Sequence, residues 1–151
     1  MRSILAKIAA ASLVIGALVA PGPAAGASAN SPTYVKKSLV IGHSVKNRPI
    51  KAWFRGDPQA KRVLLVIGQM HGDERDGPKT ARYIRDHLRP KKGTAVWIIP
   101  TMNPDGHAKK KRTNARGVDL NRNWPTSGWS KKGKGSRTWG GKKKASEPET
   151  K

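Results

Sequence analysis

Cysteine is absent from this chain of 151 residues, so no disulfide can staple the fold. Acidic residues are scarce: 9 Asp and Glu stand against 31 Lys and Arg, giving a formal net charge of +22. The apolar run near the start, residues 8–20, has only 13 residues, whereas a membrane span needs roughly 20. Stability must therefore come from a core, a metal or a partner, and a transmembrane helix is not favoured.

The first 29 residues have the order of a secretory signal. Arg2 and Lys7 precede the uncharged run, and small residues follow it up to Ala29. This pattern predicts cleavage after Ala29, a mature chain of residues 30–151, and a secreted or cell-wall-associated protein. A retained membrane anchor is the alternative interpretation.

The excess of positive charge favours anionic surfaces, such as cell-wall polymers, acidic lipids or nucleic acid. Export argues against chromatin or ribosome binding as the purpose of this charge. Any nucleic-acid binding in vitro would reflect the charge alone, so no specific nucleic-acid partner is expected.

Apolar segments between turn residues predict a chain of strands and one helix. Strands are expected over residues 38–42, 50–54, 62–68 and 94–100. The continuous apolar run of residues 62–68 is typical of a strand buried on both faces. Residues 77–90 predict a helix, with Pro78 in its first position and Ala81, Ile84 and Leu88 on one face. A strand–helix–strand order implies a parallel pair joined by a right-handed crossover, so the fold class is α/β.

The pattern weakens after Thr101. Residues 126–144 are rich in Gly, Lys and Trp and contain no acid, which predicts a basic loop with little regular structure. The final "SEPETK" is typical of a helix start, with Ser146 as the cap. A chain that stops where a helix begins suggests a truncated domain.

His71 and Glu74 lie three positions apart directly after the strand predicted over residues 62–68. Ligands of open α/β sheets bind beyond the carboxyl ends of the strands, which makes this pair a candidate for two metal ligands. A catalytic zinc needs three protein ligands, however, so the spacing also fits charged residues that cap a loop.

A second motif, "RTNARGVDLNRNWP", alternates guanidinium and amide side chains: Arg112, Asn114, Arg116, Asn121, Arg122 and Asn123. Arginine binds carboxylates through two parallel hydrogen bonds, and a neighbouring amide adds a donor. The motif is thus either a carboxylate clamp or a solvated basic loop.

Taken together, "VLLVIGQMHGDE", "PTMNPDG", "GVDLNRNWP" and "SEPET" resemble the M14 family of zinc carboxypeptidases, in particular its branch of murein peptide amidases. The resemblance implies a mixed, largely parallel sheet with flanking helices. It also implies zinc bound by His71 and Glu74, and Arg112 as the group that polarises the scissile carbonyl, with Arg116 as a rival. Asn121 and Arg122 would hold the carboxylate of a peptide or murein-peptide substrate.

The family takes its third zinc ligand and its general base from segments that would follow Lys151. His87 and His107 are expected to be surface residues, and Glu147 and Glu149 to be helix-start charges. We therefore expect a zinc-dependent metallocarboxypeptidase or peptide amidase that is incomplete at its C-terminus and inactive as this chain. The alternative is a basic wall-binding protein on a degenerate peptidase scaffold, in which residues 126–144 would bind anionic polymers.

Overall fold

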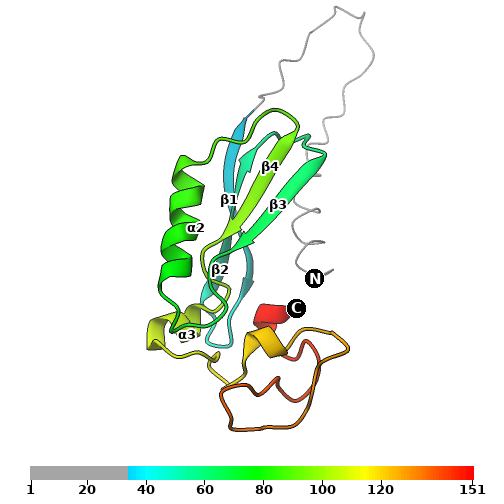
Figure 1. Ribbon diagram of the computed structural model, residues 1–151. Coiled ribbons are helices and arrows are strands. Elements are labelled where there is room, and N and C mark those ends of the chain that lie inside the picture. Colours follow the sequence, from blue (N-terminus) through cyan, green and yellow to red (C-terminus); the bar gives the residue numbers. More distant parts are fainter. Residues whose placement is uncertain (1–33) are drawn as a thin grey trace, which may run out of the picture.

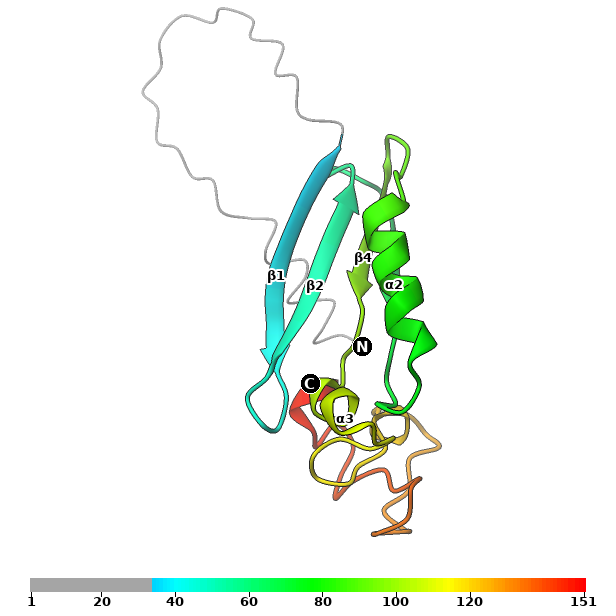
Figure 2. The same ribbon diagram turned by 90° about the vertical axis from the view of Figure 1, so that its left-hand side faces the viewer.

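The computed structural model describes residues 34–151. The predicted signal sequence lies outside the described residues. A four-stranded sheet in the order β1-β2-β4-β3 carries helix α2 against one side (Figures 1 and 2). The elements are β1 (Val35–His43), β2 (Pro49–Gly56), β3 (Arg62–Ile67), α2 (Asp76–His87), β4 (Thr94–Ile99), α3 (Pro104–Lys109) and the 3₁₀ turns η1 (Leu120–Arg122) and η2 (Pro148–Thr150).

The sheet is mixed. β1 and β2 form an antiparallel hairpin, β2 pairs antiparallel with β4, and β3 pairs parallel with β4. The predicted α/β class, the mixed sheet with a flanking helix and the parallel strand–helix–strand unit are confirmed. Within these four strands, antiparallel pairs outnumber the one parallel pair, because the N-terminal hairpin supplies half of the sheet.

β4 is the centre of the core because it has a neighbour on each side. Its side chains alternate between the two faces, as in any strand. Val96 and Ile98 pack with Ala81 of α2, whereas Trp97 packs on the other face, where its ring meets Phe54 edge-on at 5.1 Å between centroids.

β3 corrects one expectation. It is an edge strand, and its side chains Val63 and Leu64 are 55% and 60% exposed. Burial of a strand on both faces requires other elements packed over both faces of the sheet, and an edge strand is covered less completely than a central one. β3 has a neighbouring strand, β4, along one edge only. The apolar pattern therefore predicted the strand correctly, but the prediction that it is fully buried is wrong.

Helix α2 also differs in detail from its prediction. It begins at Asp76, so Pro78 is its third residue, a place where a missing N–H still costs no helical hydrogen bond. Ala81 is buried and Ile84 half-buried, but Leu88 is the C-cap and is 40% exposed. The apolar face is therefore shorter than its sequence spacing indicated.

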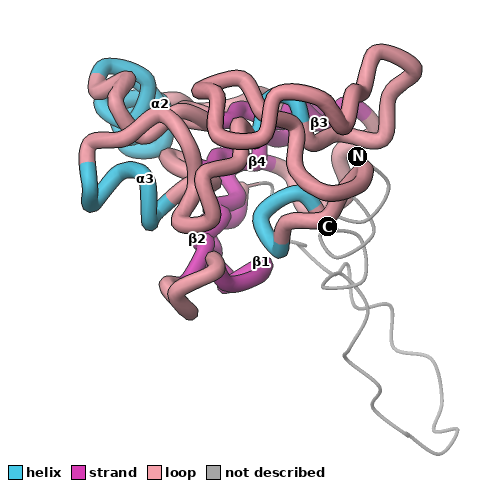
Figure 3. Tube along the Cα trace, turned by 90° about the horizontal axis from the view of Figure 1, so that it is seen from below, coloured by secondary structure: helices cyan, strands magenta, loops and turns pink. Residues whose placement is uncertain are grey.

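The loops gather at the end of the sheet where β3 and β4 finish, as seen from below in Figure 3. Residues 126–144 contain no helix or strand. The loop is nevertheless anchored, since Trp139 is buried and the carbonyl of Gly140 accepts bonds from Asn123 and from the Trp129 indole. Within residues 34–151, no helix combines the length and the apolar character that crossing a bilayer requires.

Candidate active site

The loop that carries His71 and Glu74 is fixed by the segment after β4. Gly68 N donates to Ile99 O at 2.8 Å, and Met102 N donates to Gln69 O at 3.0 Å. The buried amide of Asn103 donates to Met70 O at 3.0 Å. A Cβ at Gly72 would collide with the backbone of Gly106, so glycine alone permits this approach. The parallel pair thus places the loop beyond the carboxyl ends of β3 and β4, as predicted.

His71 is held between two carboxylates. Its Nε2 lies 3.0 Å from Asp119 Oδ1, and its Nδ1 lies 2.8 Å from Glu74 Oε1. The imidazole is buried, whereas the Glu74 side chain is 59% exposed. His71 and Glu74 therefore come together as the sequence predicted, on the rim of the protein rather than in its interior.

Asp119 is the residue that sequence reasoning missed. Its fully buried carboxylate accepts both the Nε and Nη2 hydrogens of Arg112, at 3.1 and 2.9 Å, on Oδ2. Its Oδ1 accepts the backbone N–H of Asn121 at 3.0 Å as well as the His71 contact. The sequence did contain one indication of its role: Asp119 stands between the apolar residues Val118 and Leu120. A charged residue within a buried segment needs a charged or hydrogen-bonding partner.

This arrangement fits a metal ligand pair. An ionised Asp119 accepts only, so the proton of His71 belongs on Nε2 and the lone pair of Nδ1 faces Glu74 Oε1. Two acceptors at this distance need a shared cation or proton between them. A histidine whose other nitrogen is fixed by a carboxylate, beside a carboxylate oxygen, is a donor set that zinc accepts.

No third donor joins the pair among residues 34–151, where no group of three His, Cys, Asp or Glu side chains could hold a metal. His87 and His107 are both exposed, and their Nδ1 atoms contact Tyr83 O and Gln69 Oε1 respectively. Their predicted place on the surface is confirmed. A catalytic zinc site needs three protein ligands, so the described residues bring together two candidate donors.

Arg112 and Arg116 take different places. Arg112 reaches the cluster, with its Nη1 3.9 Å from Glu74 Oε1. Arg116 instead turns to Glu147, at 3.4 Å, and its side chain is 55% exposed. The geometry therefore favours Arg112 over Arg116 as the cation beside the metal pair.

Asn121 and Arg122 lie on η1, which Asp119 caps. Their side chains line a cavity of about 220 Å³, walled on its other side by residues of the basic loop such as Trp129 and Lys132. Asn121 is tied to the cluster through its backbone N–H only. The predicted clamp residues follow Asp119 directly in the chain, and they line a cavity of their own.

The C-terminal acids lie at the start of the short turn η2, as predicted, but both are buried. Glu147 and Glu149 are each 3% exposed and share the amide of Asn114, at 2.9 and 3.2 Å. Burial raises the pKa of the Glu149 carboxyl by more than hydrogen bonds from Val45 N and Asn114 lower it. The predicted cap at Ser146 is wrong: the cap position is Glu147, and the Ser146 hydroxyl donates to the Glu147 side chain.

A family model described as zinc carboxypeptidase matches residues 26–151. The chain belongs to this family, the M14 peptidases. The family's name implies zinc, in agreement with the donor set around His71. The resemblance drawn from the motifs is confirmed.

Known relatives agree. The chain is 32% identical over 121 residues to murein peptide amidase A of Escherichia coli (strain K12), covering 72% of this chain and 49% of that protein. It is 33% identical over 108 residues to carboxypeptidase SOL1 of Arabidopsis thaliana, covering 60% and 22%. The chain thus spans about half or less of the length of these relatives.

Solved structures show the same fold. The murein-tripeptide amidase of Escherichia coli O157 superposes with a TM-score of 0.55 at 25% identity, over 83% of this chain and 56% of that one. The bovine thrombin-activatable fibrinolysis inhibitor, solved with a tick carboxypeptidase inhibitor, gives a TM-score of 0.64 at 21% identity, over 76% and 46%. The carboxypeptidase-like fold is therefore shared, at least over the part that this chain covers.

Proposed function

We propose that this chain supplies two zinc ligands, a transition-state cation and a carboxylate clamp to an exported peptidase. The enzyme would hydrolyse a peptide bond near a free carboxylate in a peptide or a murein peptide. The observation that carries the proposal is the orientation of His71: Asp119 holds Nε2, so Nδ1 is presented to Glu74. Charged residues that merely capped a loop would not need a buried carboxylate behind the histidine.

His71 and Glu74 would hold the zinc. When bound, zinc supplies a Lewis acid that polarises a carbonyl and lowers the pKa of a coordinated water. Arg112 is oriented by two hydrogen bonds to Asp119, which leaves its Nη1 directed toward the Glu74 side of the cluster. It would stabilise negative charge as it develops on the carbonyl oxygen.

Asn121 and Arg122 would bind the substrate's free carboxylate. Both side chains are exposed at a cavity large enough for a small side chain, and the guanidinium can form two parallel bonds to a carboxylate. The family match supports this assignment over the wall-binding alternative.

Because the described residues bring two metal donors together, we expect the 151-residue chain to bind zinc weakly and to show no turnover. Zinc titration against a competing chelator tests the ligand assignment. Binding should vanish in His71→Ala and Glu74→Ala and persist in His87→Ala, a histidine on the exposed face of α2. Equal loss in all three variants, or tight binding that ignores His71, would refute the proposed site.

A further inference from the structure

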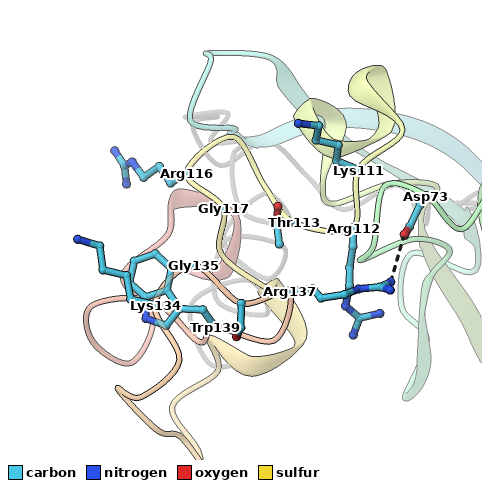
Figure 4. Close-up of a pocket in the computed structure, with 11 residues that line it drawn as sticks. Asp73, Lys111, Arg112, Thr113, Arg116, Gly117, Lys134, Gly135, Arg137 and Trp139 are labelled. Atoms are coloured by element: carbon cyan, nitrogen blue, oxygen red, sulfur yellow. Dashed lines mark ion pairs between the residues drawn. The ribbon is translucent and has the colours of Figure 1, made fainter.

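A cavity of about 820 Å³ opens beside the metal pair, between residues 111–117 and 134–139 (Figure 4). Five of its lining side chains are cationic and one is acidic: Lys111, Arg112, Arg116, Lys134, Arg137 and Asp73. The five cations come from two separate segments of the chain. The fold therefore concentrates positive charge at this one place.

This charge is only partly neutralised. Arg137 lies 3.8 Å from Asp73, a contact that is long and exposed to solvent. Lys111 and Lys134 form no ion pair within the described part of the chain. Arg112 and Arg116 pair with the buried carboxylates of Asp119 and Glu147. The unneutralised positive charge of the cavity therefore comes mainly from Lys111, Lys134 and the weakly paired Arg137.

The remaining walls suit a peptide more than a phosphate polymer. Trp139 contributes a buried aromatic ring, and its Nε1 has no hydrogen-bond partner among residues 34–151. Gly117 and Gly135 present bare backbone, with nothing within 4 Å of where a Cβ would stand. An acidic side chain with its methylene groups fits a wall that is partly apolar, and Asp73 disfavours a dense row of phosphates.

Arg112 connects the cavity to the candidate active site. It lines the cavity and also donates to Asp119, the carboxylate that holds His71. A second cavity of about 430 Å³ shares Lys111, Thr113 and Gly117 with the first, so the two cavities adjoin and together form a basic groove. An extended ligand can thus reach from Arg112 into the groove.

We propose that this groove is a subsite for an acidic segment of the peptide substrate, with Lys134 and Arg137 as its specificity-determining cations. The assignment rests on the proposed peptidase function, since it places the bound segment beside the metal pair. It adds that the preferred substrate carries carboxylates beyond the one held by Asn121 and Arg122.

Fluorescence anisotropy of a short labelled peptide with two glutamates, against its glutamine counterpart, tests this on the 151-residue chain. The double variant Lys134→Ala/Arg137→Ala should weaken binding of the glutamate peptide about fivefold, since each exposed pair contributes little. Lys142→Ala/Lys144→Ala is the matched control, because it removes the same charge from exposed positions of the neighbouring segment. It should change binding less than about twofold. Asp73→Asn should strengthen binding.

Equal losses in the two double variants would mean that only general charge is sensed, and would overturn the subsite. The subsite is also refuted if inorganic polyphosphate binding, and not peptide binding, depends on Lys134 and Arg137. The zinc titration separates this from the peptidase function. Selective peptide binding without zinc binding at His71 would support the subsite and refute the proposed peptidase function. Zinc binding at His71 without selective peptide binding would refute the subsite alone.

Discussion

Replacement of Asp119 by alanine should destabilise the fold and weaken zinc binding by His71 and Glu74. The carboxylate is fully buried and accepts from the Arg112 side chain and from Asn121 N, while its Oδ1 fixes His71 Nε2. Removing one partner of a buried charge pair costs about 3–5 kcal/mol. Arg112 is 21% exposed, so water recovers part of this loss and we expect about 3 kcal/mol.

A loss of this size is large against the total stability of a small domain, which is about 5–15 kcal/mol. It corresponds to a fall in Tm of about 10 °C for a chain of this length. Zinc affinity should fall about 10–100-fold as well, because His71 loses the group that fixes its orientation. Denaturant unfolding and chelator competition measure the two effects.

Asp76→Ala is the control, because it removes the same charge from a side chain that is 92% exposed and pairs with the exposed Lys79. It should change stability by less than about 0.5 kcal/mol. A double-mutant cycle with Arg112→Ala should show coupling, with the double variant less destabilised than the two single losses together. If Asp119→Ala is as stable as the Asp76 variant and binds zinc like the wild type, Asp119 does not stabilise the fold or orient His71 as proposed.

Glu149→Gln should remove part of the pH dependence of stability, because burial raises the pKa of the Glu149 carboxyl. The neutral carboxyl therefore contributes its full stability below the ordinary carboxyl range, about pH 4. That contribution is lost as the pH rises through the folded pKa. Thermal unfolding should therefore show the wild type losing stability relative to the variant as the pH rises above about 4, and parallel curves would contradict this. Asn123→Ala should cost about 3 kcal/mol, because its buried amide bonds Gly140 O, Lys143 O and Glu147 N, and limited proteolysis should then cut residues 126–144 faster. In a longer version of this protein that turns over substrate, Arg122→Lys should raise KM for substrates with a free carboxylate, since lysine cannot form the two-bond fork. Arg112→Ala should instead lower kcat, and matching kinetic changes in these two variants would mean that the roles are misassigned.

Much of the architecture could be predicted from local sequence patterns. Four apolar segments predicted the four strands, and the run between Gly77 and Pro90 predicted the helix that crosses between β3 and β4. The pairing of β3 with β4 followed from that order, because a strand–helix–strand unit closes on a parallel pair. The spacing of His71 and Glu74 after a strand end likewise placed them at the edge where ligands bind.

The rest depended on contacts between residues far apart in the chain. Asp119 lies 48 positions from His71, and no local period or turn signal links the two. Val63 and Leu64 have the same apolar character as the residues of β4, and only the strand order makes one strand an edge and the other the core. Glu147 and Glu149 have the spacing of helix-start charges, and only their contact with Asn114 beneath the loop shows that both are buried.

The sequence by itself determined the elements and the family, and it predicted His71 and Glu74 as the metal ligands, because each of these follows from the spacing of a few neighbouring residues. The tertiary structure alone decided which carboxylate orients His71, which arginine joins it, and where five cations converge into one cavity. Those are properties of non-local packing, in which side chains from separate loops are fixed against one another by buried charges and hydrogen bonds.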